Sequence, residues 1–176
     1  MPTSSYRRLF SEWRLGPIEL RNRIVLSAMT TGFGYDAGAP DDDLLAYFAA
    51  RSRGVAMATV AFGAVAPEGR VEQKIPWMWR PDAAAVLAPL AAAIDAAGAV
   101  ACLQLGHGGR QVSPKVTGAN PVAPSPLPPE VHVAVAPHEL STAETRELVA
   151  AFIHSAGVAA EAGFGAVEIH GAHGYL

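Results

Sequence analysis

The sequence has a single cysteine, few charged residues and no long hydrophobic segment. Cys102 alone excludes an internal disulfide and a cysteine-only metal site, and it fits a reducing compartment. Charged residues make up 16% of the chain and the net charge is −3, so charge gives no basis for a nucleic-acid partner. The apolar runs 55–66 and 83–94 are shorter than the roughly 20 residues of a membrane helix. Residues 1–14 are polar and lack the apolar core of a signal peptide. We therefore expect a cytoplasmic protein without a membrane partner.

What the sequence does contain is the composition of a globular domain, with 51% apolar residues. A chain of this length can hide roughly 70% of its unfolded surface in one core. Cys102 lies inside the apolar run 100–105 and is expected to be a small buried hydrophobic residue.

Four apolar segments of strand length alternate with three helical segments. We expect strands at 24–29, 57–61, 100–105 and 166–169, and helices at 41–53, 81–97 and 141–162. Asp41 can cap the first helix, Pro81 can open the second, and Ser141 with Glu144 forms a capping box for the third. A short hairpin with a Gly16-Pro17 turn is expected before the first strand. The connection 106–138 holds seven prolines and is expected to be an irregular functional loop or linker.

Alternating apolar strands and helices predict an α/β fold with a parallel sheet covered by helices. Two architectures fit this order, an open doubly wound sheet and half of a (β/α)8 TIM barrel. A dinucleotide-binding sheet should carry G-x-G-x-x-G after its first strand, where this chain has Ser-Ala-Met-Thr-Thr-Gly at 27–32. The polar, chemistry-bearing segments follow the ends of strands, as in barrel enzymes. The half barrel, with about four βα units, is therefore the prediction.

Four segments carry a resemblance to a known family. They are LRNRIVLSAMT at 20–30, PEGR at 67–70, LQLGHGGR at 103–110 and VEIHGAHGYL at 167–176. In this order, at the ends of strands, they resemble the family of old yellow enzyme, 2,4-dienoyl-CoA reductase and trimethylamine dehydrogenase. The resemblance implies that 1–176 is a single partial FMN-binding domain, the N-terminal half of the barrel. It would comprise a hairpin region 1–23, four strands with their helices and the loop 106–138, and it would stop before the barrel closes.

The resemblance implies cofactor-binding roles for two strand ends. Ala28, Met29 and Thr30 match the segment that lies against the flavin, where a threonine hydroxyl can tune the redox potential. Gln104 matches a glutamine at the flavin pyrimidine edge, and an uncompensated amide inside an apolar strand would otherwise be costly. The family often has proline where this chain has Ala28.

The last segment carries the implied catalytic residues. His170 and His173 match the pair that donates hydrogen bonds to a substrate carbonyl oxygen, where negative charge develops during reduction. Tyr175 matches a proton donor to the α-carbon, and with an ordinary pKa near 10 it is protonated at neutral pH. His107 is interpreted as structural. The family usually has a small residue near 61–63, so Phe62 is expected to crowd the flavin unless Gly63 takes that place by a one-residue shift.

The resemblance implies an FMN-dependent oxidoreductase that passes hydride from NADH or NADPH to an α,β-unsaturated carbonyl compound. A 4Fe-4S cluster and FAD in a longer parent protein, and a homo-oligomer, remain open. The alternatives are a truncated inactive fragment, a metal-dependent barrel hydrolase using His107, His170 and His173, and a nucleotide-binding module with 106–109 as its phosphate loop. No metal site is expected. Further spots are expected to serve surface, cap or packing roles only: His132, His138, His154 and 77–79.

Overall fold

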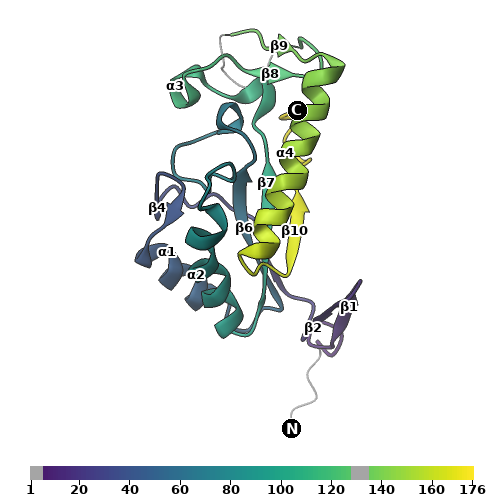
Figure 1. The fold of residues 1–176 in the computed structure, drawn as a ribbon. Helices are drawn as coiled ribbons and strands as arrows, with labels where there is room; N and C mark the ends of the chain where they lie inside the picture. Colours follow the sequence, from purple (N-terminus) through teal and green to yellow (C-terminus); the bar gives the residue numbers. More distant parts are fainter. Residues whose placement is uncertain (1–5, 128–134) are drawn as a thin grey trace.

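The computed structural model describes residues 6–127 and 135–176. The first five residues of the predicted region 1–23 lie outside the described residues, as do 128–134 of the long connection, His132 included. The chain opens with the predicted hairpin, in which strands β1 (Trp13–Leu15) and β2 (Ile18–Leu20) pair antiparallel around Gly16. Figure 1 shows this hairpin at one end of the molecule and the C-terminus toward the other.

The centre of the fold is a parallel sheet of four strands. They are β3 (Val25–Leu26), β6 (Met57–Ala64), β7 (Val100–Gly106) and β10 (Ala166–Ile169). Their order in the sheet is β3-β6-β7-β10, which is also their order along the chain. All four predicted strands are present, although β3 covers only two residues of the predicted 24–29 and β6 continues three residues beyond the predicted 57–61. A doubly wound sheet reverses its strand order at a switch point, whereas a barrel does not.

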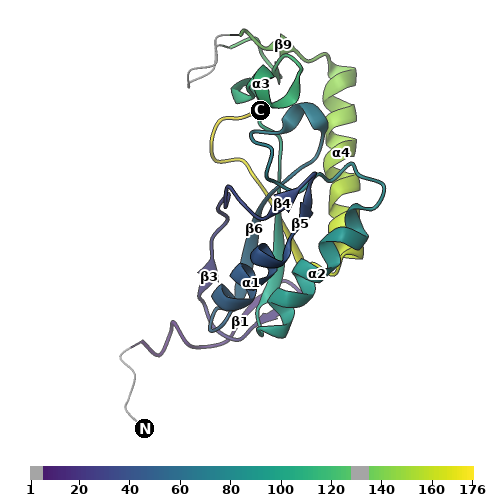
Figure 2. The same ribbon diagram turned by 90° about the vertical axis from the view of Figure 1, so that its left-hand side faces the viewer.

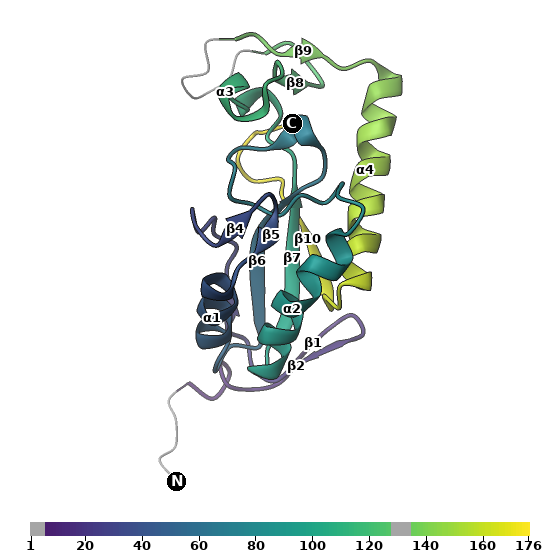
Figure 3. The same ribbon diagram turned by 60° about the vertical axis from the view of Figure 1, so that its left-hand side comes forward.

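Three helices cover one face of this sheet. Helices α1 (Asp42–Arg51), α2 (Ala83–Ala96) and α4 (Thr142–Glu161) each follow a strand, and α2 packs against both of the others. Figure 3 shows α2 in front of the strands, with α1 to its left and α4 to its right. The shared core has Leu44 and Phe48 from α1, Leu87 and Leu90 from α2, and Ala159 from α4. One-sided winding in sequential order is the arrangement of a barrel segment, so the open doubly wound alternative is wrong.

The alternation along β7 separates the core from the opposite face. Leu103 and Leu105 belong to the core beneath the helices and are fully buried. Cys102 alternates with these core residues along the strand. It packs instead with Leu20 and Met57 near the hairpin. Burial raises the pKa of its thiol to about 11, so it stays protonated at neutral pH. The expectation of a small buried hydrophobic residue is confirmed, and Gln104 follows two residues later in the strand.

The first two helices start differently from each other. The carboxylate of Asp41 accepts a hydrogen bond from the backbone N–H of Leu44 at 3.0 Å and caps α1 as predicted. Helix α2 begins at Ala83, two residues later than expected, and Asp82 makes no capping bond. Its two oxygens accept hydrogen bonds from the Arg80 guanidinium at 2.8 Å each, so the side chain is not available to the helix.

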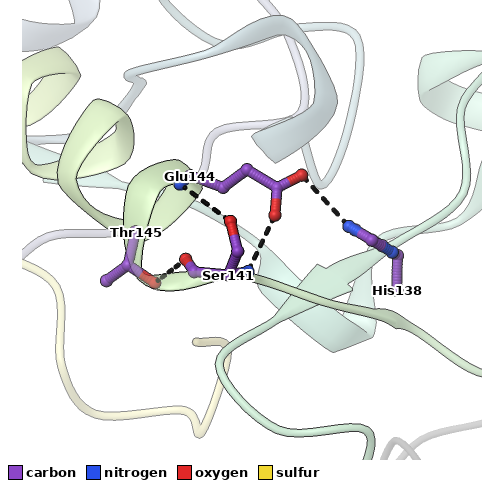
Figure 4. A network of polar contacts seen from close by, with 4 residues as sticks. All are labelled: His138, Ser141, Glu144 and Thr145. Atoms are coloured by element: carbon purple, nitrogen blue, oxygen red, sulfur yellow. Dashed lines mark hydrogen bonds and ion pairs between the residues drawn. The ribbon is translucent and has the colours of Figure 1, made fainter.

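The third helix begins with the predicted capping box, drawn in Figure 4. The Ser141 hydroxyl oxygen accepts from the Glu144 N–H at 3.2 Å, and Glu144 accepts from the Ser141 N–H at 2.7 Å. His138 lies 3.1 Å from the other carboxylate oxygen. These contacts, with the Ser141 side chain first, lower the pKa of Glu144 from 4.5 to about 2. His138 therefore serves the cap, as expected of it.

Replacing Ser141 with alanine is expected to lower the free energy of unfolding by about 1 kcal/mol at pH 7, because an orphan N–H loses its acceptor. The depressed pKa of Glu144 means that its contribution is complete above about pH 4.5 and is lost as the pH falls toward 2. The difference between wild type and Ser141→Ala should therefore shrink over that range. Urea unfolding followed by circular dichroism from pH 7 to 2 measures this. Ser125→Ala, which removes an exposed serine outside any helix start, is the control, and an equal difference at every pH would contradict the assignment.

The connections hold more regular structure than expected. Residues 35–40 form a small hairpin of β4 (Tyr35–Asp36) and β5 (Ala39–Pro40). The long connection contains the short helix α3 (Pro114–Thr117) and a parallel pair, β8 (Val122–Ala123) with β9 (His138–Glu139). Two 3-10 turns, Pro67–Gly69 and Gly109–Gln111, follow β6 and β7. Figure 2 places α3, β9 and the C-terminus at one end of the molecule. No helix in the described ranges is long and apolar enough to cross a membrane.

Candidate active site

A cavity of about 560 Å³ lies where the parallel strands end. Its walls include every residue for which the sequence predicted a site role, namely Ala28, Met29, Thr30, Gln104, His170, His173 and Tyr175. Its other wall residues are Ala61, Phe62, Val71 and Glu72. The carboxyl ends of neighbouring parallel strands share one edge of the sheet, which explains how segments far apart in sequence meet here.

The segment after β3 supplies one wall. Ala28 packs against the buried cluster of Ala61 and Phe62, while Met29 is 52% exposed. Thr30 is also exposed, and its hydroxyl makes no hydrogen bond within the described part of the chain. This wall thus presents an unengaged hydroxyl and a backbone that can lie against a ligand.

The side-chain amide of Gln104 faces the cavity, with its nitrogen hydrogen-bonded and its carbonyl oxygen free among the described residues. It is 8% exposed, and its Nε2 donates to Oε1 of Glu168 at 2.5 Å. Glu168 is the residue directly opposite Gln104 in the β10–β7 pairing. The carboxylate therefore sets the orientation of the amide and leaves the Gln104 carbonyl oxygen as an acceptor. Sequence reasoning missed Glu168, although the four-strand order and equal distances from the strand ends would have placed the two residues side by side.

His170, His173 and Tyr175 form one cluster of rings. Nε2 of His170 lies 3.1 Å from Nδ1 of His173, and the Tyr175 ring centroid is 5.1 Å from that of His170. Burial, and then the neighbouring His173, lower the pKa of His170, so its imidazole is neutral at pH 7. Burial, and then the charge of Glu72, raise the pKa of Tyr175, so its phenol is protonated. The two histidines bond to each other here, and they must part before both can face one ligand oxygen.

The turn after β7 holds the segment 173–175 in place. The backbone N–H of Arg110 donates to the carbonyl oxygen of Tyr175 at 2.9 Å, and Nε of Arg110 donates to Gly174 O at 3.0 Å. Nε2 of Gln111 donates to His173 O at 2.7 Å. Gly109 has φ +54°, and a Cβ there would lie 1.9 Å from the backbone carbonyl oxygen of Tyr175. Sequence reasoning missed this clamp of 109–111, since nothing local marks these residues as partners of 173–175.

The structure decides between the two arrangements expected for Phe62 and Gly63. Gly63 does not take its place, because a Cβ on Gly63 would point at Met78 and Leu103 in the core. An irregularity in the pairing of β6 with β7 lies between Val60 and Gly63, and it leaves both Ala61 and Phe62 on the cavity wall. Phe62 is 2% exposed and packs near His170, at 5.8 Å between ring centroids. It forms a buried wall of the cavity, and Ala61 is the small residue beside it.

His107 does not line the cavity. It is 2% exposed, its Nδ1 accepts from the Gly109 N–H at 3.0 Å, and its Nε2 lies 3.8 Å from Glu68. The imidazole lowers the pKa of Glu68 and supports the turn at 109, which is a structural role. Within residues 6–127 and 135–176, no three His, Cys, Asp or Glu side chains gather closely enough to hold a metal ion. The histidine trio that a hydrolase would need is therefore not assembled.

The remaining aromatic and histidine positions contribute packing. Trp77 and Trp79 stack with centroids 5.5 Å apart, and Met78 is fully buried. His154 is exposed on α4.

A second hollow, of about 640 Å³, lies beside the hairpin and is lined by residues such as Trp13, Arg14 and Arg21. It lies at the opposite end of the strands from the histidine–tyrosine cluster and contains none of the predicted site residues.

Comparison with known proteins gives consistent results. The model of the NADH:flavin oxidoreductase / NADH oxidase family matches residues 8–176. NADH oxidase of Thermoanaerobacter brockii is 35% identical over 175 residues, covering 97% of this chain and 27% of that protein. The 4,4'-dithiodibutanoate disulfide reductase of Rhodococcus erythropolis is 38% identical over 187 residues, covering 100% of this chain and 43% of the relative.

A solved structure agrees with these relatives. The old yellow enzyme homologue of Zymomonas mobilis superposes with a TM-score of 0.86 and 28% identity, over 96% of this chain and 49% of that one. The predicted fold class, half of a (β/α)8 barrel, is confirmed. The chain spans between about a quarter and a half of the length of these proteins.

Proposed function

The chain belongs to the NADH:flavin oxidoreductase / NADH oxidase family, and from that premise we propose that its cavity binds FMN and reduces an activated alkene with NADH or NADPH. One observation carries the proposal. The seven residues that the sequence singles out for cofactor and substrate line a single cavity at the carboxyl ends of the strands. Active sites of barrel enzymes occupy that end.

The donor set of the cavity fits a flavin. Its volume of about 560 Å³ lies within the range of small-ligand sites, roughly 300–1,000 Å³. The free carbonyl oxygen of Gln104 can accept from a ring N–H, and the free hydroxyl of Thr30 can donate to a ring carbonyl. Ala28 and Met29 supply backbone against the ring. When bound, FMN supplies the hydride carrier between the nicotinamide and the substrate.

His170, His173 and Tyr175 would act on an α,β-unsaturated carbonyl substrate. The neutral imidazole of His170 carries one N–H, and once the histidine pair opens a ring N–H of each histidine can donate to the carbonyl oxygen. Donors placed there stabilise the enolate-like charge that develops on the oxygen. Tyr175 keeps its proton at neutral pH and lies beside both rings, so it can deliver that proton to the α-carbon.

A titration of the chain with FMN tests the proposal. Quenching of flavin fluorescence and a shifted visible spectrum should saturate, and the bound form should consume NADH or NADPH when an enone is present. Gln104→Ala is expected to weaken FMN binding by about tenfold, the equivalent of one hydrogen bond. Gln73→Ala, which removes a glutamine that bonds to Val116 outside the cavity, should bind as wild type does.

The predicted alternative, a chain that keeps the site residues but binds no flavin, gives the opposite outcome. A folded chain that shows no saturable FMN binding would contradict the proposed function. Binding that is equally strong in Gln104→Ala would contradict the role given to Gln104.

A further inference from the structure

Glu72 is the one ionisable wall residue in the described ranges to which the function proposed above assigns no contact with cofactor or substrate. It lies on the loop that follows the 3-10 turn Pro67–Gly69, and it lines the cavity with Val71 and Tyr175. Its Oε1 atom is buried and has no hydrogen-bond partner among the described residues. The charge of Glu72 reaches Tyr175, which places the carboxylate near the proposed proton donor.

No cation of the cavity neutralises this carboxylate. The wall residues in the described ranges include neither lysine nor arginine. The nearest arginine along the chain, Arg70, is engaged elsewhere, because it donates to the carbonyl oxygens of Pro67 and Val116 and lies over the Trp77 ring. Glu72 is thus the sole acidic residue of the described wall.

A buried carboxylate oxygen without a donor is costly, and such groups in native proteins call for a physical explanation. Burial raises the pKa of Glu72, which is the sign of a charge that the protein alone does not stabilise. Because Glu72 lines the cavity, a ligand that brings a hydrogen-bond donor to this carboxylate would reduce the cost. A ligand that brings a second carboxylate would add like-charge repulsion in a partly desolvated site.

Resting on the function proposed above, we propose that Glu72 determines substrate class. Its carboxylate accepts a hydrogen bond from a hydroxyl, amide N–H or ammonium group on the substrate. The cavity therefore favours neutral or cationic enones that carry such a donor, and it discriminates against enones that carry a carboxylate. Glu72 is a specificity residue in this scheme, and it neither accepts hydride nor supplies the proton.

Three cyclohexenones that differ in one ring substituent test the proposal, with a carboxamide, a carboxylate or a methyl group at the same carbon. With wild type and FMN, kcat/KM for the carboxamide should exceed that for the carboxylate by at least about tenfold. Glu72→Gln should lower this ratio to about threefold or less, because the amide can also donate to a carboxylate. The methyl compound, which carries neither a donor nor a charge, is the reference to which the other two rates are normalised for each enzyme. Glu147→Gln removes an exposed carboxylate on α4 and is the control for net charge.

A second measurement needs no turnover. The saturated carboxamide and carboxylate ketones cannot be reduced, and their binding can be followed by NMR of the His170 and His173 ring protons. The carboxamide should bind more tightly to wild type, and Glu72→Gln should remove the preference. Turnover of the methyl compound with an unchanged carboxamide-to-carboxylate ratio in Glu72→Gln overturns this inference alone. Absence of FMN binding and of turnover with all three compounds overturns the proposed function, and this inference with it.

Discussion

Replacing His170 with alanine is expected to lower kcat/KM for an enone by about 10²- to 10³-fold, the effect of losing one donor to a developing oxyanion. Nε2 of His170 lies 3.1 Å from Nδ1 of His173, and both rings are proposed to donate to the same substrate carbonyl oxygen. The kcat/KM of the double variant should therefore be little lower than that of the single variant. FMN binding should change much less than turnover, because the FMN-holding groups proposed above are Thr30, Gln104 and the backbone at 28–29. Steady-state kinetics together with FMN titration of each variant measure both effects.

His154→Ala is the matched control, since it removes an exposed histidine on α4 far from the strand ends. It should leave both kcat/KM and FMN binding unchanged. If His170→Ala retained full kcat/KM while binding FMN normally, the substrate-carbonyl role of the histidine pair would be wrong. If the two single variants lost activity additively, they would act at separate points.

Gly109→Ala is expected to lower turnover by about 10²-fold and to reduce the free energy of unfolding by about 1–2 kcal/mol. The stability loss follows from placing a Cβ on a residue at φ +54°. The loss of turnover follows from a collision with the backbone. That Cβ would lie 1.9 Å from the backbone carbonyl oxygen of Tyr175 and would displace the segment 173–175. A displacement of about 1 Å at a catalytic group can cost about 10²-fold in rate. Thermal unfolding and enone reduction measure the two effects separately.

Gly118→Ala is a control with the same backbone strain and no collision. Gly118 has φ +76°, and nothing lies within 4 Å of the position where its Cβ would be. It should lose similar stability and keep its turnover. Equal turnover in the two variants would show that the clamp of 109–111 does not position Tyr175.

The elements that could be predicted from the sequence depend on contacts between near neighbours along the chain. The capping box of Ser141 and Glu144, the cap at Asp41 and the apolar run that forms β7 all join residues within one turn or one strand. Such interactions depend on sequence spacing alone, so the pattern that predicts them is also the pattern that forms them in the folded chain. The predicted start of the second helix at Pro81 was two residues early, and the Asp82 carboxylate beside that start is bonded to Arg80 instead of to the helix. The predictions also failed where short strands such as β8 and β9 pair across a long loop.

The sequence by itself determined the α/β order and the approximate positions of the strand ends, because strand and helix periodicity is local. The seven residues proposed for the site came from its resemblance to a known family. Only the tertiary structure decided how those residues are engaged. The bond from Gln104 to Glu168 and the clamp on Gly174 each join residues 64 positions apart. Whether Phe62 or Gly63 faces the cavity depends on one irregularity in the pairing of β6 with β7. These outcomes follow from strand register and loop packing, and a single residue of slip in register exchanges the two faces of a strand.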